Sequence, residues 1–260
     1  AWMQRIGVKA IKVDFFGGDK QQTLQLYRDI LSDANDYGLQ VIFHGCTLPR
    51  GWERMYPNFV ASEAALASEN VYFTDYHAKR EAFELTMYPF TRNAVAAFDW
   101  GGVLMNRYMS KDNKSRHQRF TGDIFEMATA ITNQTSVNCV ALTPDALATL
   151  PAFEIEWLRQ LPTAWSDLRF LGGYPGKYFA VARQTTAGKW YAAAINADPK
   201  PLTLTLDLPM FAGKVVKVYA DGPKNKGSLW LTPGMKQQKV GRNGRLMVTV
   251  QPNGGVIVNE

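Results

Sequence analysis

Short apolar runs alternate with longer stretches of helical periodicity in the first 165 residues. The run VKAIKVDFF at residues 8–16 predicts a buried strand, and LQVIFH at residues 39–44 predicts a second one. Between them, apolar residues recur at three- and four-residue steps over residues 20–37, which predicts a helix that ends at Gly38. We expect a βαβ unit here, because such apolar strands suit a parallel sheet that is covered on both faces.

The same alternation continues less regularly towards residue 161. We expect strands at residues 56–62, 94–99 and 137–142, and helices at residues 77–87, 122–134 and 153–161. A closed (β/α)8 barrel needs about 250 residues, so about five βα units are too few to close one. We therefore expect an α/β fold in which residues 1–165 form the C-terminal part of a (β/α)8 TIM-type barrel. An open, doubly wound sheet is the alternative.

The pattern changes to short alternating strands from about Leu168 onwards. Turns rich in Gly, Pro and Asn separate these strands at a spacing of about ten residues, which is typical of an antiparallel sandwich. The predicted strands are KYFAVARQ, KWYAAAIN, LTLTLDL, KVVKVYADG, RLMVTVQ and GGVIVNE. Residues 166–260 are therefore expected to form a small antiparallel β-sandwich domain.

Charge divides the chain at the same place. Residues 1–165 contain 16 basic and 18 acidic side chains, whereas residues 166–260 contain 13 and 5. The basic residues are spread singly through the predicted strands, which favours a solvated surface over a nucleic-acid site. No apolar run approaches the ~18 residues of a membrane span. The two cysteines, Cys46 and Cys139, match no metal-binding or disulfide framework, and we expect both to be free and buried.

Charged residues stand at the predicted carboxyl ends of the strands, where parallel α/β folds place their sites. Asp14 ends the first strand, and Lys12, two residues earlier, points to the same face. The lysine would keep Asp14 ionised as a nucleophile or base, although a buried ion pair that fixes the strand register would produce the same pattern. His44 ends the next strand, either as a hydrogen-bonded structural residue or as part of a site.

Two carboxylates, Glu63 and Glu69, follow the third predicted strand, six residues apart. Residues six apart do not share a helix face, so the spacing alone indicates a surface loop, but an irregular loop could bring both to one cation or one sugar. Paired carboxylates beside a cation suit glycoside hydrolysis, a metal-dependent lyase or a phosphatase. The chain contains no Gly-rich phosphate loop, serine elbow or HExxH motif.

Several segments, in order, resemble glycoside hydrolase family 97, and the resemblance extends over essentially the whole chain. The segments are GVKAIKVDFFGGDKQ, VIFHGCTLPRGWERMYPNFVASEAALASE, MYPFTRNAVAAFDW and GGYPGKYFAVARQ. The resemblance implies a bacterial, exo-acting α-glycosidase with an N-terminal β-sandwich, a (β/α)8 barrel and a small C-terminal β-sandwich. Because the chain starts at Ala1 within a helical pattern, we expect a C-terminal fragment whose first domain and export signal lie outside it, and a periplasmic or secreted location.

The resemblance also implies which branch of the family the chain is similar to. Retaining members, which include α-galactosidases, have an aspartate nucleophile that matches Asp14. Inverting members lack it and carry a base glutamate after the histidine, where this chain has Gly45. Both features imply a retaining, α-galactosidase-like enzyme. The alternatives are an inverting α-glucosidase of the same family and a non-catalytic fragment.

Roles for the remaining residues follow from the same resemblance. Glu69 matches the general acid/base, and Glu63 matches a glutamate that binds calcium, a cofactor that Glu69 also approaches. Lys12 and His44 would hold hydroxyl groups of the sugar and tune Asp14. The expected cofactor is calcium, and the expected partner is a small oligosaccharide or α-glycoside, with no nucleic acid. The family segment MDYTPG corresponds here to FDWGG, residues 98–102.

Overall fold

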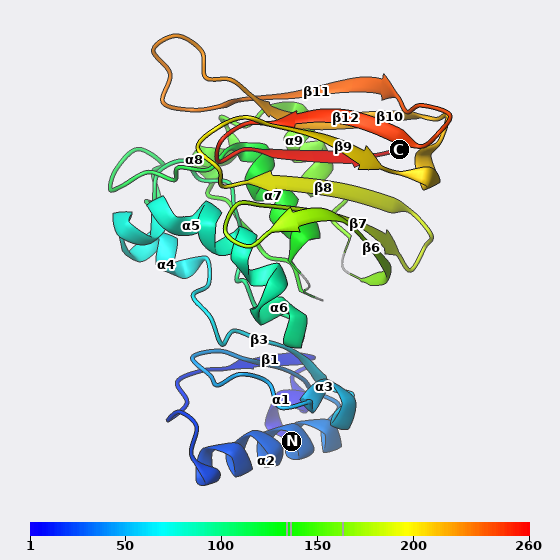
Figure 1. Ribbon diagram of the computed structural model, residues 1–260. Helices are drawn as coiled ribbons and strands as arrows, with labels where there is room; N and C mark the ends of the chain where they lie inside the picture. The colour runs from blue at the N-terminus through cyan, green and yellow to red at the C-terminus, as the bar shows by residue number, and fades with distance from the viewer. Residues whose placement is uncertain (134, 136, 163) are drawn as a thin grey trace.

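The computed structural model describes residues 1–133, 135, 137–162 and 164–260. Figure 1 shows two sheet regions at opposite ends of the molecule, with most of the helices between them. The N-terminal region contains parallel strands, and the region from Trp165 onwards contains antiparallel strands. The change of sheet type therefore falls at the place where the charge and the strand pattern change.

The N-terminal sheet is parallel, with strand order β1-β2-β3. Its elements are α1 (Trp2–Arg5), β1 (Ala10–Val13), α2 (Gln21–Asp36), β2 (Gln40–Phe43), α3 (Trp52–Met55) and β3 (Phe59–Ser62). The predicted βαβ unit is thus confirmed. Its core is aromatic: the Tyr27 ring on α2 lies 4.8 Å from that of Phe43 on β2 and 4.6 Å from that of Trp52. This packing fixes the carboxyl end of β2, where His44 stands.

Helices dominate the middle of the chain. The elements are α4 (Glu69–Phe73), α5 (Asp75–Met87), the 3-10 helix η1 (Tyr88–Phe90), α6 (Arg92–Val95), β4 (Val103–Leu104), α7 (Asp123–Thr132), β5 (Val140–Ala141), α8 (Pro144–Leu147) and α9 (Ala152–Leu158). The predicted helices at 77–87, 122–134 and 153–161 correspond to α5, α7 and α9. Between α7 and α9, β5 pairs in parallel with β4, a strand that the pattern did not predict.

The strand predicted at residues 94–99 is wrong over its first half, because Arg92–Val95 form the helical turn α6. Only Phe98 joins the sheet, through a single parallel bridge to Ser62. A short apolar run fits a strand and a buried helical turn equally well, so periodicity could not separate the two. The same limit applies to the strand predicted at 137–142, which is reduced to the two residues of β5.

The C-terminal strands form an antiparallel, sandwich-like region, as predicted. They are β6 (Trp165–Tyr174), β7 (Tyr178–Thr185), β8 (Trp190–Asn196), β9 (Leu202–Asp207), β10 (Val215–Gly222), β11 (Thr232–Lys239), β12 (Arg245–Val250) and β13 (Gly255–Asn259), with the 3-10 helix η2 (Pro209–Phe211) after β9. Six of them pair in the order β11-β10-β13-β8-β7-β6, and β12 pairs with β9. Apolar side chains of both sheets share one core.

Helix α7 packs against the C-terminal sheet. All ten of its residues are buried, and its apolar side chains pack with those of β7, β8, β10 and β13 in one cluster. Asp221 on β10 accepts hydrogen bonds from the backbone N–H groups of Ile124 (3.1 Å) and Phe125 (2.8 Å), which satisfies the first turn of the helix. The C-terminal sheet therefore supports the helices that stand between it and the parallel strands.

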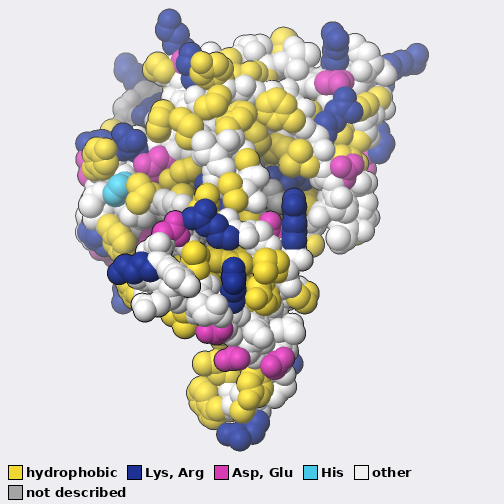
Figure 2. All heavy atoms as spheres, turned by 60° about the horizontal axis from the view of Figure 1, so that its bottom comes forward, with side chains coloured by type: hydrophobic (Ala, Val, Ile, Leu, Met, Phe, Trp, Pro, Cys, Tyr) yellow, Lys and Arg dark blue, Asp and Glu magenta, His cyan; other side chains and the backbone are white. Residues whose placement is uncertain are grey.

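Basic side chains do not gather in one patch on the face that Figure 2 shows; Lys and Arg are scattered over it among hydrophobic and acidic groups. Both cysteines are free, as predicted, but Cys139 is exposed and Cys46 is half-buried, so the expectation that both are buried is wrong. None of the helices in the described part of the chain is long and apolar enough to cross a membrane.

Candidate active site

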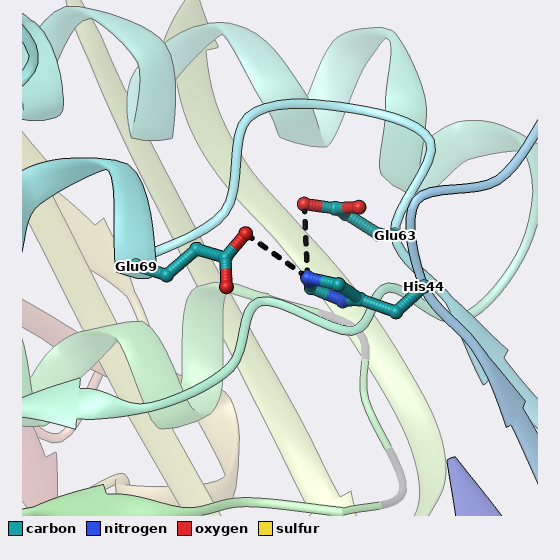
Figure 3. Close-up of side chains that lie close together, drawn as sticks. All are labelled: His44, Glu63 and Glu69. Atoms are coloured by element: carbon teal, nitrogen blue, oxygen red, sulfur yellow. Dashed lines mark hydrogen bonds and ion pairs between the residues drawn. The ribbon is translucent and has the colours of Figure 1, made fainter. Parts of the chain in front are cut away.

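Three side chains meet at the carboxyl edge of the β1-β2-β3 sheet. His44 directly follows β2, Glu63 directly follows β3, and Glu69 is the first residue of α4. Figure 3 shows the carboxylates of Glu63 and Glu69 pointing towards one nitrogen of His44. Each of the three residues offers one ligand atom, and these atoms lie within 4.8 Å of one another. The structure thus brings together three of the predicted site residues.

His44 is the centre of this group and is buried. Its Nε2 atom lies 3.1 Å from Oε1 of Glu69 and 3.3 Å from Oε1 of Glu63, and its Nδ1 atom lies 2.8 Å from Oδ2 of Asp99. The hydrogen bond with Asp99 raises the pKa of His44 most, burial opposes it, and the two glutamates add to the increase, giving a pKa of about 9. At neutral pH the ring is therefore positively charged, and both nitrogens donate.

Asp99 is a member of the site that the sequence reasoning did not assign. Its Oδ2 atom accepts a hydrogen bond from His44 and forms an ion pair with Lys12, whose Nζ atom is 2.8 Å away. Burial alone would raise the pKa of Asp99, but the hydrogen bonds from His44 and Lys12 outweigh it and hold the pKa below its usual value. The residue ends the run 94–99, so the strand-end rule that selected Asp14 and His44 could have found it.

Lys12 therefore has a different partner from the one expected. Its ammonium group pairs with Asp99, not with Asp14. The reason is local: β1 ends at Val13, and Phe15 has a φ of 65°, so the backbone turns away from the strand direction at Asp14. The alternation of side chains that would place Lys12 and Asp14 on one face does not extend past the end of the strand.

Asp14 instead lies against Gly45. Its Oδ1 atom accepts a hydrogen bond from the backbone N–H of Phe15 at 2.7 Å. A Cβ atom added to Gly45 would stand 2.5 Å from this Oδ1 atom and 3.0 Å from the Phe15 nitrogen. Gly45 also has a φ of 52°, a left-handed conformation that favours glycine. Asp14 thus occupies the space that a side chain at position 45 would need.

Gly45 also connects Asp14 with the glutamates. Its backbone N–H donates to Oε2 of Glu63 at 2.7 Å, while its carbonyl accepts from Phe16 at 3.0 Å. Burial raises the pKa of Glu63, and the Gly45 N–H and the charge of His44 oppose that increase. Glu63 is buried, and the Glu69 side chain is 47% exposed. The surface-loop interpretation of this pair is therefore wrong for Glu63, because the loop turns inward at residue 63.

Alanine at position 45 tests the close approach to Asp14. We expect Gly45→Ala to displace the Asp14 carboxylate and to lower catalytic activity as well as the melting temperature. The left-handed backbone costs about 1 kcal/mol for alanine, and the contact with Asp14 adds to that cost. Gly38→Ala is a matched control, because Gly38 has a φ of 66° and nothing within 4 Å of an added Cβ atom. Equal losses of activity in the two variants would contradict the prediction.

The donor set has a mixed chemistry. Two carboxylates are oxygen ligands of the kind that calcium prefers, whereas an imidazole nitrogen suits transition metals. Because calcium prefers oxygen ligands, the carboxylate oxygens of Glu63 and Glu69 are the atoms of this group that fit a calcium ion. They would form two of the six to eight oxygen ligands that calcium takes.

Models of known protein families match both ends of the chain. A family model described as Glycoside hydrolase 97 matches residues 1–65, and one described as Glycosyl-hydrolase 97 C-terminal, oligomerisation, matches residues 164–259. A probable retaining α-galactosidase of Streptomyces bingchenggensis is 30% identical over 224 residues, which are 85% of this chain and 32% of the relative. A retaining α-galactosidase of Bacteroides thetaiotaomicron is 24% identical over 256 residues, 96% of this chain and 38% of the relative.

Two solved structures are similar in fold to the whole chain. The crystal structure of a β-arabinopyranosidase superimposes with a TM-score of 0.93 and 49% identity, covering 100% of this chain and 40% of that one. A glycoside hydrolase family 97 enzyme from a Pseudoalteromonas species, in complex with acarbose, superimposes with a TM-score of 0.80 over 99% of this chain and 42% of that one; at 18% identity it shows the fold alone. The chain spans about a third to two fifths of the length of these relatives. With both ends matched by models of one family, the chain belongs to glycoside hydrolase family 97.

Proposed function

We propose that the protein containing this chain is a retaining, exo-acting α-glycosidase of the α-galactosidase type. The observation that carries the proposal is the contact between Asp14 and Gly45. Because Asp14 fills the space beside Gly45, a glutamate at position 45 would displace the Asp14 carboxylate from the place it has in this backbone. The resemblance links the aspartate to retention and the glutamate to inversion, so this contact supports the retaining enzyme over an inverting α-glucosidase.

The reaction divides into two steps. Asp14 would attack the anomeric carbon and form a covalent glycosyl-enzyme while Glu69 gives a proton to the leaving oxygen. Glu69 would then take a proton from water, whose oxygen attacks the same carbon and releases Asp14. The Phe15 N–H group orients the Asp14 carboxylate. In a retaining enzyme the two carboxyl groups stand about 5–5.5 Å apart, the distance we expect in the complete gene product.

The parallel strands fit a wider architecture. We propose that residues 1–165 are the C-terminal part of a (β/α)8 barrel and that residues 166–260 are a separate sandwich. The position of His44, Glu63 and Asp99 after parallel strands or extended segments supports the barrel, because barrel enzymes build their sites at that edge. The description of the matched C-terminal family model further supports self-association through residues 164–259.

A terminal sugar of galactose configuration is the proposed substrate. An α-D-galactopyranoside and a β-L-arabinopyranoside have the same ring stereochemistry and differ only in the hydroxymethyl group at C5. The relatives named α-galactosidase support the first, and 49% identity to a β-arabinopyranosidase supports the second as an additional candidate.

Aryl glycosides test this proposal. The kcat/KM of the complete gene product is measured on 4-nitrophenyl α-D-galactopyranoside, β-L-arabinopyranoside and α-D-glucopyranoside. We expect hydrolysis of one or both galactose-configured substrates, with the glucoside cleaved far more slowly, because an inverted hydroxyl leaves buried polar groups unpaired. Preferential hydrolysis of the α-glucoside would favour the inverting alternative.

We also propose that Glu63 and Glu69 hold a calcium ion, which would place positive charge close to the leaving-group oxygen. Removing calcium with a chelator is expected to lower both activity and melting temperature, and added calcium to restore them. Glu63→Gln should raise the half-saturating calcium concentration about 10- to 100-fold, whereas Glu156→Gln, an exposed position, should not change it. A melting temperature that calcium leaves unchanged in the wild-type protein would contradict the calcium site.

A further inference from the structure

Arg92 is a buried cation behind the candidate site, and the reaction described above does not use it. We infer that Arg92 is a positioning residue, which holds the end of β3 and the segment before Asp99 in the geometry that the site requires. The inference rests on the proposed function, because the geometry in question is that of Glu63, Asp99 and His44. Arg92 would not touch the substrate.

The guanidinium group of Arg92 binds oxygens from two separate segments. At the end of β3, Nε donates to the Glu63 carbonyl (2.7 Å), and Nη2 donates to the carbonyl (2.5 Å) and the hydroxyl (3.0 Å) of Ser62. On the other segment, Nη1 donates to the Ala96 carbonyl and Nη2 to the Ala97 carbonyl, each at 3.0 Å. The Arg92 side chain therefore joins the backbone of Glu63 to the backbone of the two residues that precede Phe98 and Asp99.

The same two segments also meet through their backbones. The Asp99 N–H group donates to the Ser62 carbonyl at 2.9 Å, and the Ser62 N–H group donates to the Ala97 carbonyl at 3.4 Å. This backbone contact is short, since Phe98 makes the only β-bridge between the two segments in the described residues. Arg92 adds hydrogen bonds to four carbonyl groups and one hydroxyl group of these two segments. The relative positions of Glu63 and Asp99 therefore depend on the Arg92 side chain.

Arg92 is held without a carboxylate partner. No ion pair among the described residues includes it, and its guanidinium carbon lies 5.3 Å from the centre of the buried Phe98 ring. Burial lowers the pKa of Arg92 to about 10. A buried charge without a paired anion is costly, and the planar fork of N–H groups compensates by satisfying several carbonyls at once. Lysine, with three donors at one point, cannot reproduce this set.

Arg183 provides a matched comparison within the same chain. It is buried on β7, burial lowers its pKa to about 10, and its Nε donates to the carbonyl of Ile131 at 2.7 Å. Burial thus lowers the pKa of both arginines similarly, but the side-chain hydrogen bond that Arg183 makes among the described residues goes to Ile131, outside the candidate site. A difference between the two lysine variants therefore reports on position, not on the loss of a buried guanidinium.

Kinetics separate a positioning role from a purely structural one. In the complete gene product, Arg92→Lys is expected to lower kcat about 10- to 100-fold with KM changed less than about threefold, because small displacements of catalytic groups have effects of this size. Arg183→Lys should lower the melting temperature and leave kcat unchanged. Wild-type kcat in Arg92→Lys, or equal loss of kcat in both variants, would overturn the inference.

Two further measurements cover the remaining outcomes. If Arg92→Lys does not fold, Ser62→Ala removes one Arg92 contact, and it should lower kcat several-fold; an unchanged kcat would overturn the inference. A crystal structure of Arg92→Lys should show Glu63 and Asp99 displaced relative to His44 when it is compared with a crystal structure of the wild type. An unchanged arrangement of these residues would overturn the inference, whether or not the wild type is active. A wild-type protein that hydrolyses none of the glycosides refutes the proposed function instead.

Discussion

Asp14→Asn is expected to lower kcat/KM on the order of 10⁴-fold or more on a galactose-configured glycoside. The amide keeps the shape of the side chain and fits beside Gly45, but it is a far poorer nucleophile than a carboxylate and cannot carry the glycosyl group in the same way. The hydrogen bond from the Phe15 N–H group can be kept by the amide oxygen. We therefore expect a melting temperature close to that of the wild type.

The measurement is the initial rate of hydrolysis by purified variants of the complete gene product. Each variant is prepared twice, independently, so that contamination with wild-type enzyme can be excluded. Asp36→Asn is the control, because Asp36 is an exposed aspartate on the last turn of α2. The control should retain wild-type kinetics. An Asp14→Asn variant with more than about a tenth of the wild-type rate would show that this carboxylate forms no covalent bond to the sugar.

Glu69→Gln is expected to have an effect that depends on the leaving group. For an alkyl galactoside, whose leaving oxygen needs a proton, the rate of the first step should fall about 10²- to 10⁴-fold. For a 2,4-dinitrophenyl galactoside, whose leaving group needs none, that step should change little, and the glycosyl-enzyme should accumulate because water is no longer activated. Burst kinetics and a series of aryl glycosides measure this difference. An equal loss for all leaving groups would contradict the acid/base role of Glu69.

The sheet edge was the most predictable part of the candidate site. Apolar strands that end in polar residues identified Asp14 and His44 from the sequence, and the parallel sheet places both at its carboxyl edge. The six-residue spacing of Glu63 and Glu69 did not indicate that both lie at this sheet edge. Their meeting at His44 depends on a loop whose path is set by distant contacts, such as the hydrogen bond from the Tyr88 hydroxyl to the Leu66 carbonyl.

Asp99 and Arg92 show why the remaining residues of the site were missed. Their functional contacts are with residues far away in the sequence: Asp99 with Lys12 and His44, and Arg92 with Ser62 and Glu63. Local periodicity reports which face of an element is buried, but not which distant segment packs there. Arg92 begins the helical turn α6, which overlaps the strand predicted at residues 94–99, whereas Asp99 stands at the end of that predicted strand.

In the C-terminal region, the two strands that the pattern missed are both at edges of the sheet. β6 and β11 form the two ends of the six-stranded sheet, and most of their side chains are exposed or half-buried. Edge strands carry charged, Gly or Pro residues that interrupt apolar alternation. The central strands β7, β8 and β13 are buried over most of their length and were predicted from their apolar residues alone.

The central claim is that Asp14 forms the bond to the sugar, and the stereochemistry of azide rescue tests it most directly. In Asp14→Gly the space left by the carboxylate admits azide, which would attack the anomeric carbon from the side that Asp14 occupied. Given an α-galactoside with an activated leaving group, the variant is expected to produce a β-galactosyl azide, identified by the coupling constant of its anomeric proton. An α-configured azide from this variant would contradict the account, because attack would then come from the other face and Asp14 would not be the nucleophile.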